Sequence, residues 1–359
     1  MDDVVTVAVT GLNARPENPA PGIAVARCLA EAGRRVRLIG FGYESLDSGL
    51  YRHDLFDSTY LLPFPTAGRD LFHERLLAVH AAERIDVLIP CLDAELPICI
   101  AGASALAQEG IATFLPTHEQ FTFRAKERLA EAAKAAGIAT PQTIQVFDPG
   151  FFYTCMNLGW TYPLVVKGSI YDAIVTYNAG QATAAFNQIV SRWGHPVLAQ
   201  RHVAGDECNL CAIGDGAGRL IGPVMMKKRA LTDKGKAWAG VCIDDGVLLD
   251  AANRLAAHLK WRGPCEIEGV RSADGAFNLL EINPRFPAWV YFTHGVGRNL
   301  PMALVDMALG RSAPAFERAA VGTLFIRYAQ EVVLPMHAFE TMVTAGSLPR
   351  HEEASLWTV

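Results

Sequence analysis

Three glutamates and an asparagine between residues 266 and 283 have the types and spacing of a cation site. Glu281 and Asn283 interrupt the apolar segment NLLEIN, and Glu266 and Glu268 interrupt CEIEGVR. Residues two apart on a strand project from the same face, and a carboxylate buried there is costly unless something neutralises it. Carboxylate and amide oxygens are ligands for Mg²⁺, and oxygens of water and phosphate usually complete its coordination shell. The pattern therefore indicates a site for one or two Mg²⁺ ions.

The two segments are predicted to pair across a hairpin. Asp274-Gly275 between them is a dipeptide typical of tight turns. A two-residue loop there places Glu268 opposite Glu281, and it also places Glu266 opposite Asn283. A slip of one residue would turn Glu268 to the other face. The alternative is a solvated sheet face whose carboxylates pair with nearby cations; the candidates are Lys227, Lys228 and Arg285.

Composition excludes several classes of protein. A chain of 359 residues, 51% of them hydrophobic, has room for two or three domains with real cores and is expected to be globular. The formal charge of −5 gives no argument for binding nucleic acid or an anionic membrane. No apolar run approaches a bilayer-spanning length, and MDDVVTVAV lacks the basic start of a signal peptide.

The cysteines fit a reduced environment. All eight are scattered through apolar segments, which favours buried thiols and a cytoplasmic location. Cys208 and Cys211 have the spacing C-x-x-C, but no second pair completes a metal set. Both fall in a predicted strand, where this spacing points them to opposite faces. We therefore expect core cysteines.

Residues 1–117 alternate between strand and helix patterns. Helix 21–33 begins with Pro and ends with Gly, and the predicted strands are 4–9, 34–41, 58–64, 84–91 and 110–117. Such alternation is typical of a Rossmann-like parallel sheet, with ligands beyond the carboxyl ends of its strands. A G-x-G-x-x-G fingerprint does not follow the first strand, which argues against a dinucleotide site. The segments at 12–22 and 92–97 (LDAELP) follow strands and are candidates to hold a substrate carboxylate or amine, or are simple connections.

Beyond residue 118 the pattern changes to an α+β unit. A helix is predicted from residue 119 to Gly137, with further helices at 179–193 and 247–261. Between them lie short strands, several of them linked as hairpins, at 162–169, 173–178, 196–203, 207–214 and 219–226.

These features together resemble the ATP-grasp superfamily. The segment LLEINPR, residues 279–285, is similar to the superfamily's metal-binding strand. The resemblance implies that Glu268, Glu281 and Asn283 bind Mg²⁺. It also implies that Arg285 faces phosphate or the acyl phosphate of a substrate.

The resemblance extends to upstream segments that would bind ATP. It implies that Lys126, in the helix from residue 119, and Lys167, at the end of YPLVVKG, contact the phosphates. In VLAQRHVAGDECNL it implies that Gln200 and the backbone near Val203 meet adenine, and that Glu207 meets the ribose. Taken singly, Lys126 is better explained as a surface charge and Glu207 as a turn residue. Their joint order along the chain favours the nucleotide site.

Two segments near this site have an unusual composition: one is poor in glycine and the other is rich in cations. Superfamily members commonly follow the second lysine with a glycine-rich phosphate loop, whereas KGSIYDAIV has only Gly168. Backbone N–H groups of residues 169–171 are expected to cradle phosphate instead. The cation-rich segment MMKKRALTDKGKAWAG, residues 225–240, is interpreted as a mobile loop that brings Lys227, Lys228 or Arg229 to phosphates or an anionic substrate, with Lys227 and Arg229 preferred. The alternative is a solvated surface loop.

The resemblance implies an α/β front domain at 1–117 followed by an α+β ATP-grasp fold at 118–310. The latter would include a small lid at about 140–203, and residues 311–359 would form an extension packed on the ATP-grasp domain. We expect an ADP-forming carboxylate–amine ligase that uses ATP and Mg²⁺, or Mn²⁺, to join an amino acid or peptide to an amine through an acyl phosphate. The alternatives are a carboxylase-like or carbamoyl-phosphate-synthase-like subunit that uses bicarbonate, and a non-catalytic nucleotide-binding partner. A homodimer would be in keeping with the resemblance.

Overall fold

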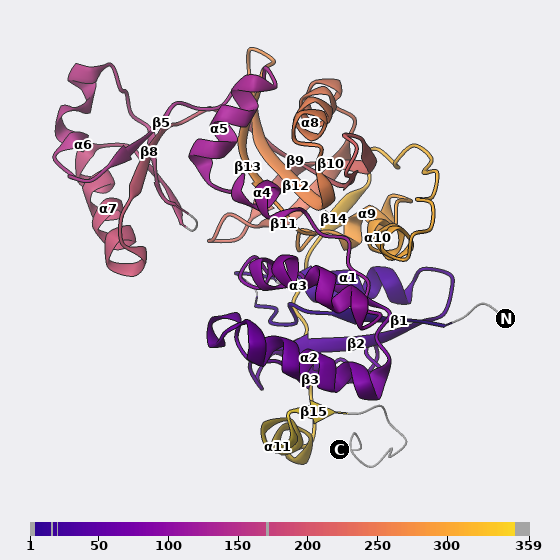
Figure 1. The fold of residues 1–359 in the computed structure, drawn as a ribbon. Helices are drawn as coiled ribbons and strands as arrows, with labels where there is room; N and C mark the ends of the chain where they lie inside the picture. The colour runs from indigo at the N-terminus through magenta and orange to yellow at the C-terminus, as the bar shows by residue number, and fades with distance from the viewer. Residues whose placement is uncertain (1–3, 16, 20, 170–171, 349–359) are drawn as a thin grey trace.

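The computed structural model describes residues 4–15, 17–19, 21–169 and 172–348, and its longer strands form three sheets. A five-stranded sheet belongs mainly to the N-terminal residues, a four-stranded sheet to residues 143–201, and a six-stranded sheet to the segment between 205 and 326. Figure 1 shows the four-stranded unit to the left of the six-stranded sheet and the N-terminal unit below that sheet.

The N-terminal sheet has the strand order β15-β3-β2-β1-β4. Four strands are parallel: β1 (Val5–Val9), β2 (Val36–Gly42), β3 (Ser58–Leu61) and β4 (Val87–Ile89). The predicted parallel sheet is confirmed for these strands. The predicted strand at 110–117 is wrong, because among the described residues this segment makes only an isolated bridge between Ala112 and Val87. Gly110, the first residue of the predicted strand, has φ 91°, so the chain turns at the start of this segment.

Helices cover both faces of this sheet. Alternation along β1 sends Val7 and Val9 to the face covered by α1 (Pro21–Ala30) and Ala8 to the opposite face. The opposite face is covered by α2 (Arg69–Glu83) and α3 (Leu96–Gln108). Parallel strands are buried on both faces in this way, which accounts for their continuous apolar sequences.

The six-stranded sheet is antiparallel and has the order β13-β12-β9-β10-β11-β14. Its strands are β9 (Gly205–Asp215), β10 (Leu220–Leu231), β11 (Ala237–Ile243), β12 (Arg262–Ser272), β13 (Phe277–Asn283) and β14 (Leu324–Ile326). One face packs on α5 (Lys126–Ala135) and α8 (Gly246–Leu259). The other face shares a core with α1 and with α9 (Tyr291–Gly295) and α10 (Leu300–Ala308). Cys208 lies on the first face and Cys211 on the second, so the prediction of core cysteines is confirmed for both.

The helix predicted from residue 119 to 137 is interrupted. It consists of α4 (His118–Thr122), which Thr117 and Gln120 begin with a capping box, and α5. Ala125, between the two helices, has extended backbone angles. The break makes Lys126 the first residue of α5.

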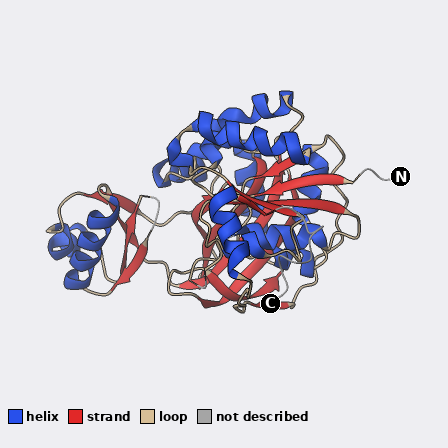
Figure 2. Ribbon diagram, turned by 90° about the horizontal axis from the view of Figure 1, so that it is seen from below, coloured by secondary structure: helices blue, strands red, loops and turns tan. Residues whose placement is uncertain are grey.

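The four-stranded unit has the order β5-β8-β6-β7, and its strands are β5 (Thr143–Val146), β6 (Leu164–Gly168), β7 (Ala173–Thr176) and β8 (Val197–Arg201). The helices α6 (Phe151–Thr154) and α7 (Ala179–Trp193) cover one face, against Val166 and Ala199. Val165, Lys167 and Gln200 alternate to the other face. Figure 2 shows this unit set apart from the rest of the molecule.

Residues 311–348 contact both of the larger sheets. Strand β14 pairs with β11, whereas β15 (Ser347–Leu348), after α11 (Met336–Ala345), pairs with β3 at the edge of the N-terminal sheet. The part of the predicted extension at 349–359 lies outside the described residues. Within the described ranges, no helix is both long and apolar enough to cross a membrane.

The hairpin β12–β13 has the predicted pairing near its open end but a different turn. Glu268 faces Glu281 and Glu266 faces Asn283, as the sequence predicts. The loop has three residues, 273–275, because the N–H of Ser272 donates to the carbonyl of Ala276. A bulge in β13 then shifts the pairing by one residue, because Leu280 is the extra residue between the pairs Glu268–Glu281 and Gly269–Leu279. The longer turn and the bulge compensate each other, and the predicted register results.

Glu95 joins the carboxyl ends of three parallel strands. Its buried carboxylate accepts hydrogen bonds from the N–H groups of Cys91 and Leu92, at 2.7 and 2.8 Å, just after β4. It also accepts from the hydroxyls of Thr10, after β1, and Tyr43, after β2. These bonds fix the turn that carries Asp93.

Replacing Glu95→Ala is expected to lower the free energy of unfolding by roughly 3 kcal/mol, because it leaves several buried donors unsatisfied. Urea denaturation measures the change. Glu44→Ala is the matched control, because that carboxylate is half exposed and lies 3.8 Å from Arg15; its expected effect is below about 0.5 kcal/mol. Equal losses in the two variants would contradict the role of Glu95.

Candidate functional site

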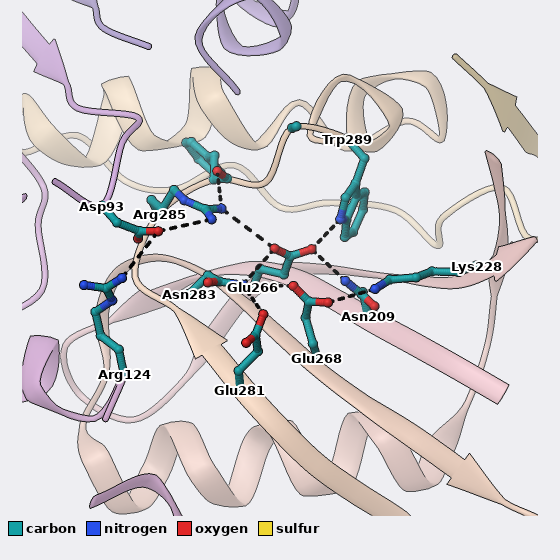
Figure 3. A network of polar contacts seen from close by, with 12 residues as sticks. Asp93, Arg124, Asn209, Lys228, Glu266, Glu268, Glu281, Asn283, Arg285 and Trp289 are labelled. Carbon is teal, nitrogen blue, oxygen red and sulfur yellow. Dashed lines mark hydrogen bonds and ion pairs between the residues drawn. The ribbon is translucent and has the colours of Figure 1, made fainter. Parts of the chain in front are cut away.

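The four residues predicted to form a cation site lie together on one face of β12 and β13 (Figure 3). The amide nitrogen of Asn283 donates to Glu268 Oε1 at 2.9 Å and to Glu266 Oε2 at 3.1 Å. It also lies 3.5 Å from Glu281 Oε1. One amide group therefore bridges three carboxylates, which we call the carboxylate cluster: Glu266, Glu268 and Glu281.

Glu266 is the most enclosed carboxylate of the cluster, with 4% of its surface exposed. Its Oε1 accepts from Trp289 Nε1 at 2.5 Å and from Asn209 Nδ2 at 2.7 Å. Burial and then the charge of Glu268 raise the pKa of Glu266 to about 7. The surroundings of Glu266 thus disfavour its ionised form.

Lys228 on β10 is the cation that pairs with the cluster. Its Nζ lies 2.9 Å from Glu268 Oε2 and 3.1 Å from Glu207 Oε2. Burial alone would lower the pKa of Lys228, but the carboxylates of Glu268 and Glu207 raise it well above its ordinary value. Burial would likewise raise the pKa of Glu268, but Lys228 and Lys236 hold it well below its usual range. Both groups of the pair are therefore charged.

The sequence prediction preferred Lys227 and Arg229 over Lys228, and the structure does not bring either of them to the cluster. Alternation turns Lys227 to the other face of the sheet, where its Nζ lies 2.6 Å from Asp206. Arg229 is exposed at a bulge of β10. The sequence signal that was missed is the facing of Lys228 with Glu207 across β9 and β10, which follows from pairing Lys227 with Cys208.

The two predicted phosphate-contacting lysines approach the cluster from other elements. Lys126 Nζ, at the start of α5, lies 3.7 Å from Glu281 Oε2. Lys167 on β6 is buried, and its burial and then the charge of Lys126 lower its pKa to about 8. The negative charges of Glu281, Glu268 and Glu207 partly oppose that shift. Lys126 therefore contacts the cluster, and Lys167 lies near enough to be influenced by the charges of Lys126 and the carboxylates.

The residues predicted to meet adenine and ribose lie along the connection from the four-stranded to the six-stranded sheet. Gln200 shares a sheet face with Lys167, and its amide donates to Thr143 Oγ1 at 2.8 Å. Val203 is half-buried between β8 and β9. Glu207 is 44% exposed beside Lys228.

The predicted phosphate loop is anchored at its far end. Asp172 has φ 62°, and its Oδ2 accepts from Trp193 Nε1 at 2.8 Å and from Arg192 at 3.2 Å, both on α7. Its carbonyl accepts from Gly168 N at 3.1 Å, which closes the loop. Ile170 and Tyr171 lie outside the described residues. Sequence reasoning did not assign this anchoring role to Asp172.

Arg285 links the cluster to the N-terminal unit. It is 12% exposed, and its guanidinium lies 3.8 Å from Glu266 Oε2 and 3.5 Å from Asp93 Oδ2. Burial alone would lower the pKa of Arg285, but these carboxylates raise it. Arg124, between α4 and α5, approaches the same Asp93 oxygen at 3.6 Å (Figure 3). Asp93 was expected from sequence only as part of a loop that could hold a ligand.

The donor set of the cluster fits a hard divalent cation. In the described part of the chain, no group of three or more His, Cys, Asp or Glu side chains is already arranged around a metal position, and Asn283 bridges the carboxylates instead. The oxygens available are nevertheless carboxylates and amides, which Mg²⁺ prefers. The buried Oδ1 of Asn209 beside the cluster also accepts no hydrogen bond from any described residue.

Comparison with known proteins identifies the fold. Residues 195–331 match the family model described as "ATP-grasp in the biosynthetic pathway with Ter operon". A biotin carboxylase from Campylobacter jejuni has a TM-score of 0.65 and 14% identity, over 87% of this chain and 72% of that one. An L-amino acid ligase from Bacillus licheniformis has a TM-score of 0.63 and 14% identity, over 86% of this chain and 75% of that one.

A third similar structure contains a nucleotide. The biotin carboxylase domain of a 2-oxoglutarate carboxylase from Hydrogenobacter thermophilus, solved with MgADP and bicarbonate, has a TM-score of 0.64 and 16% identity, over 89% of this chain and 73% of that one. No curated protein matches significantly in sequence. The chain has the ATP-grasp fold, and its resemblance to the ATP-grasp superfamily is confirmed.

The adjacent residues Lys227 and Lys228 offer a matched test of the cluster. Lys228→Met is expected to lower the free energy of unfolding by roughly 3 kcal/mol, because it leaves Glu268 buried without its cation. Lys227→Met is expected to cost less than about 1 kcal/mol, because its ion pair is partly exposed. Chemical denaturation of both variants measures the difference, and a larger loss for Lys227→Met would contradict this assignment.

Lys167→Met is expected to have the opposite effect and to stabilise the ligand-free protein. A pKa lowered to about 8 means that the buried ammonium opposes folding, on the order of 3 kcal/mol at pH 7. The unfolded chain keeps its proton up to about pH 10.5, so wild-type stability should rise between pH 8 and pH 10 relative to the variant.

Denaturation midpoints of both proteins across that pH range provide the measurement. Lys134→Met is the control, because Lys134 is exposed on α5, and its difference from wild type should not depend on pH. A difference in denaturation midpoint between Lys167→Met and wild type that does not change with pH would show that the ammonium group of Lys167 does not oppose folding.

Proposed function

We propose that this protein is an ATP-dependent carboxylate–amine ligase that forms ADP. The observation that carries the proposal is the ion pair of Lys126 with Glu281 beside the carboxylate cluster, with the buried Lys167 near enough to be influenced by Lys126, Glu281 and Glu268. Two cations beside a carboxylate cluster suit a triphosphate whose metal ion neutralises the carboxylates. The matching family model, whose description names a biosynthetic pathway, and the likeness to an L-amino acid ligase support the same activity.

Each group of residues has a role in this proposal. Glu268, Glu281 and Asn283 would hold Mg²⁺, which, when bound, neutralises phosphate oxygens and makes the γ-phosphate more electrophilic. Lys126 and Lys167 bind the phosphates, and Gln200, the backbone near Val203 and Glu207 bind the nucleoside. Lys228 keeps Glu268 ionised and oriented. Arg285 stabilises the negative charge of the acyl phosphate.

The reaction proceeds in two balanced steps. An oxygen of the substrate carboxylate attacks the γ-phosphorus of ATP, which forms an acyl phosphate and releases ADP. The nitrogen of a free amine then attacks the acyl carbon; phosphate leaves, the nitrogen loses a proton, and an amide results. The buried lysines and Arg285 lower the barriers by offering positive charge where negative charge gathers.

A carboxylase-like subunit that phosphorylates bicarbonate is the second candidate. The likeness to biotin carboxylases supports it, and one of them was solved with bicarbonate bound. Bicarbonate-dependent release of ADP without an amine or an organic acid would distinguish this reaction from ligation.

The ligase is expected to release ADP and phosphate when it is given ATP, Mg²⁺ and pooled protein amino acids, and mass spectrometry should detect a new amide. Chelation with EDTA should abolish turnover and Mg²⁺ should restore it, with Mn²⁺ tested as a replacement. Glu281→Gln should lower turnover about 100-fold or more, because it removes a metal ligand.

Glu131→Gln is the control, because Glu131 is exposed on α5, and its turnover should equal that of wild type. Release of AMP in place of ADP would mean adenylation and would rule out an acyl phosphate. Full activity of Glu281→Gln would overturn the proposed metal site.

A further inference from the structure

Asp93 presents an unused hydrogen-bonding oxygen beside Arg285. Both neighbouring guanidinium groups, those of Arg285 and Arg124, approach the same atom, Oδ2. The other oxygen, Oδ1, is buried and accepts no hydrogen bond from any residue that the structure describes. A buried carboxylate oxygen in this state is unfavourable unless a ligand donates to it.

The contacts that Asp93 does make are long. Its distances to the two guanidinium groups are 3.5 and 3.6 Å, whereas close charge-assisted pairs have about 2.7–2.9 Å between heavy atoms. The turn itself is firmly held, because Glu95 accepts from the N–H groups of Cys91 and Leu92. A rigid loop with a loosely paired carboxylate is the arrangement expected of a group that awaits a donor.

Asp93 and Arg285 place a carboxylate and a guanidinium group side by side. The ammonium nitrogen and carboxylate carbon of an α-amino acid are about 2.5 Å apart, from its bond lengths and the angle at Cα. Asp93 Oδ2 and Arg285 Nη2 are 3.5 Å apart. Because both charges of an α-amino acid are carried on one carbon, they can address two adjacent groups of opposite charge, with the ammonium group at Asp93 Oδ1, to which no described residue donates, and the carboxylate at Arg285.

The surrounding charges also favour a zwitterion over a simple acid. Asp93, Glu266, Glu268 and Glu281 all act on Arg285, and Arg124, Lys126 and Lys228 are the cations paired with this set. Negative and positive groups are thus nearly balanced. A zwitterion adds one charge of each sign, so neither of its charges is left unpaired in the buried site.

We propose that Asp93 binds the ammonium group of the acid substrate, so that the carboxylate activated by this protein is that of an α-amino acid whose amine stays free. The proposal rests on the ligase function, because it needs Arg285 at the reacting carboxylate. It makes Asp93 a specificity-determining residue that contacts substrate, and it makes Glu95 a positioning residue for Asp93.

The test compares amino acids with acids that lack only the amine. ADP release is measured with L-alanine and propionate, L-glutamate and glutarate, and L-phenylalanine and 3-phenylpropionate, each with glycinamide as the amine that attacks. Wild type should prefer the amino acid in at least one pair. Asp93→Asn should lower kcat/KM for that amino acid by about 10- to 100-fold, as loss of a charged hydrogen bond does, and change the matching acid by less than about threefold.

Asp54→Asn is the control, because Asp54 is a surface carboxylate of the same unit whose Oδ2 lies 2.6 Å from Arg52, and it should leave the preference unchanged. If Asp93→Asn lowers kcat/KM equally for the amino acid and the matching acid, with an unchanged thermal midpoint, Asp93 only orients Arg285 and the proposal is overturned. If Asp93→Asn lowers the thermal midpoint, the same comparison of substrates is made with Asp93→Glu, which keeps the carboxylate and should keep the preference for the amino acid.

The two proposals fail in different ways. ADP released by wild type with organic acids but with none of the amino acids would overturn the role of Asp93 and leave the ligase. No ADP with any acid, amino acid or bicarbonate would overturn the ligase, and the role of Asp93 with it.

Discussion

Repulsion among the carboxylates of Glu266, Glu268 and Glu281 is the constraint on which the rest of the site depends. Their charges meet on one sheet face, so every neighbouring element supplies something that offsets them. Strand β10 supplies an ammonium group, α5 supplies another from its first residue, and the segment after β13 supplies an arginine and an indole N–H. The carboxyl of Glu266 still has a raised pKa of about 7, because it is buried and lies beside Glu268. A carboxylate cluster in this state is suited to a cationic ligand.

The two buried lysines of the site differ in what surrounds them, although their burial is similar. Lys228 lies between two carboxylates, whereas Lys167 extends from the four-stranded unit toward another ammonium group. The first contributes to the stability of the ligand-free fold. The second has a lowered pKa, because burial and the charge of Lys126 disfavour its ammonium form.

Local pattern was sufficient for much of this site, and long-range geometry was needed for the rest. Spacing of two and a turn dipeptide predicted the facing of Glu268 with Glu281, although the turn is longer than expected and a bulge restores the register. The preference for Lys227 failed because the face to which a residue points depends on strand pairing with β9, which composition does not reveal. Asp93 lies almost two hundred positions from Arg285, and only the packing of one sheet's carboxyl edge against the other sheet brings them together. The helix break before Lys126 was equally hidden, because its residues are compatible with a continuous helix.

The pairing of β15 with β3 has a consequence for the order in which the protein can be completed. The first sheet has its four parallel strands as soon as residue 89 has been synthesised, whereas the partner that the described residues provide for the edge at β3 is β15, residues 347 and 348. During translation that edge presents unpaired backbone groups while more than two hundred further residues emerge from the ribosome. The N-terminal sheet is therefore completed late in synthesis, and the shortness of β3, four residues, limits the unpaired backbone that this edge presents until then.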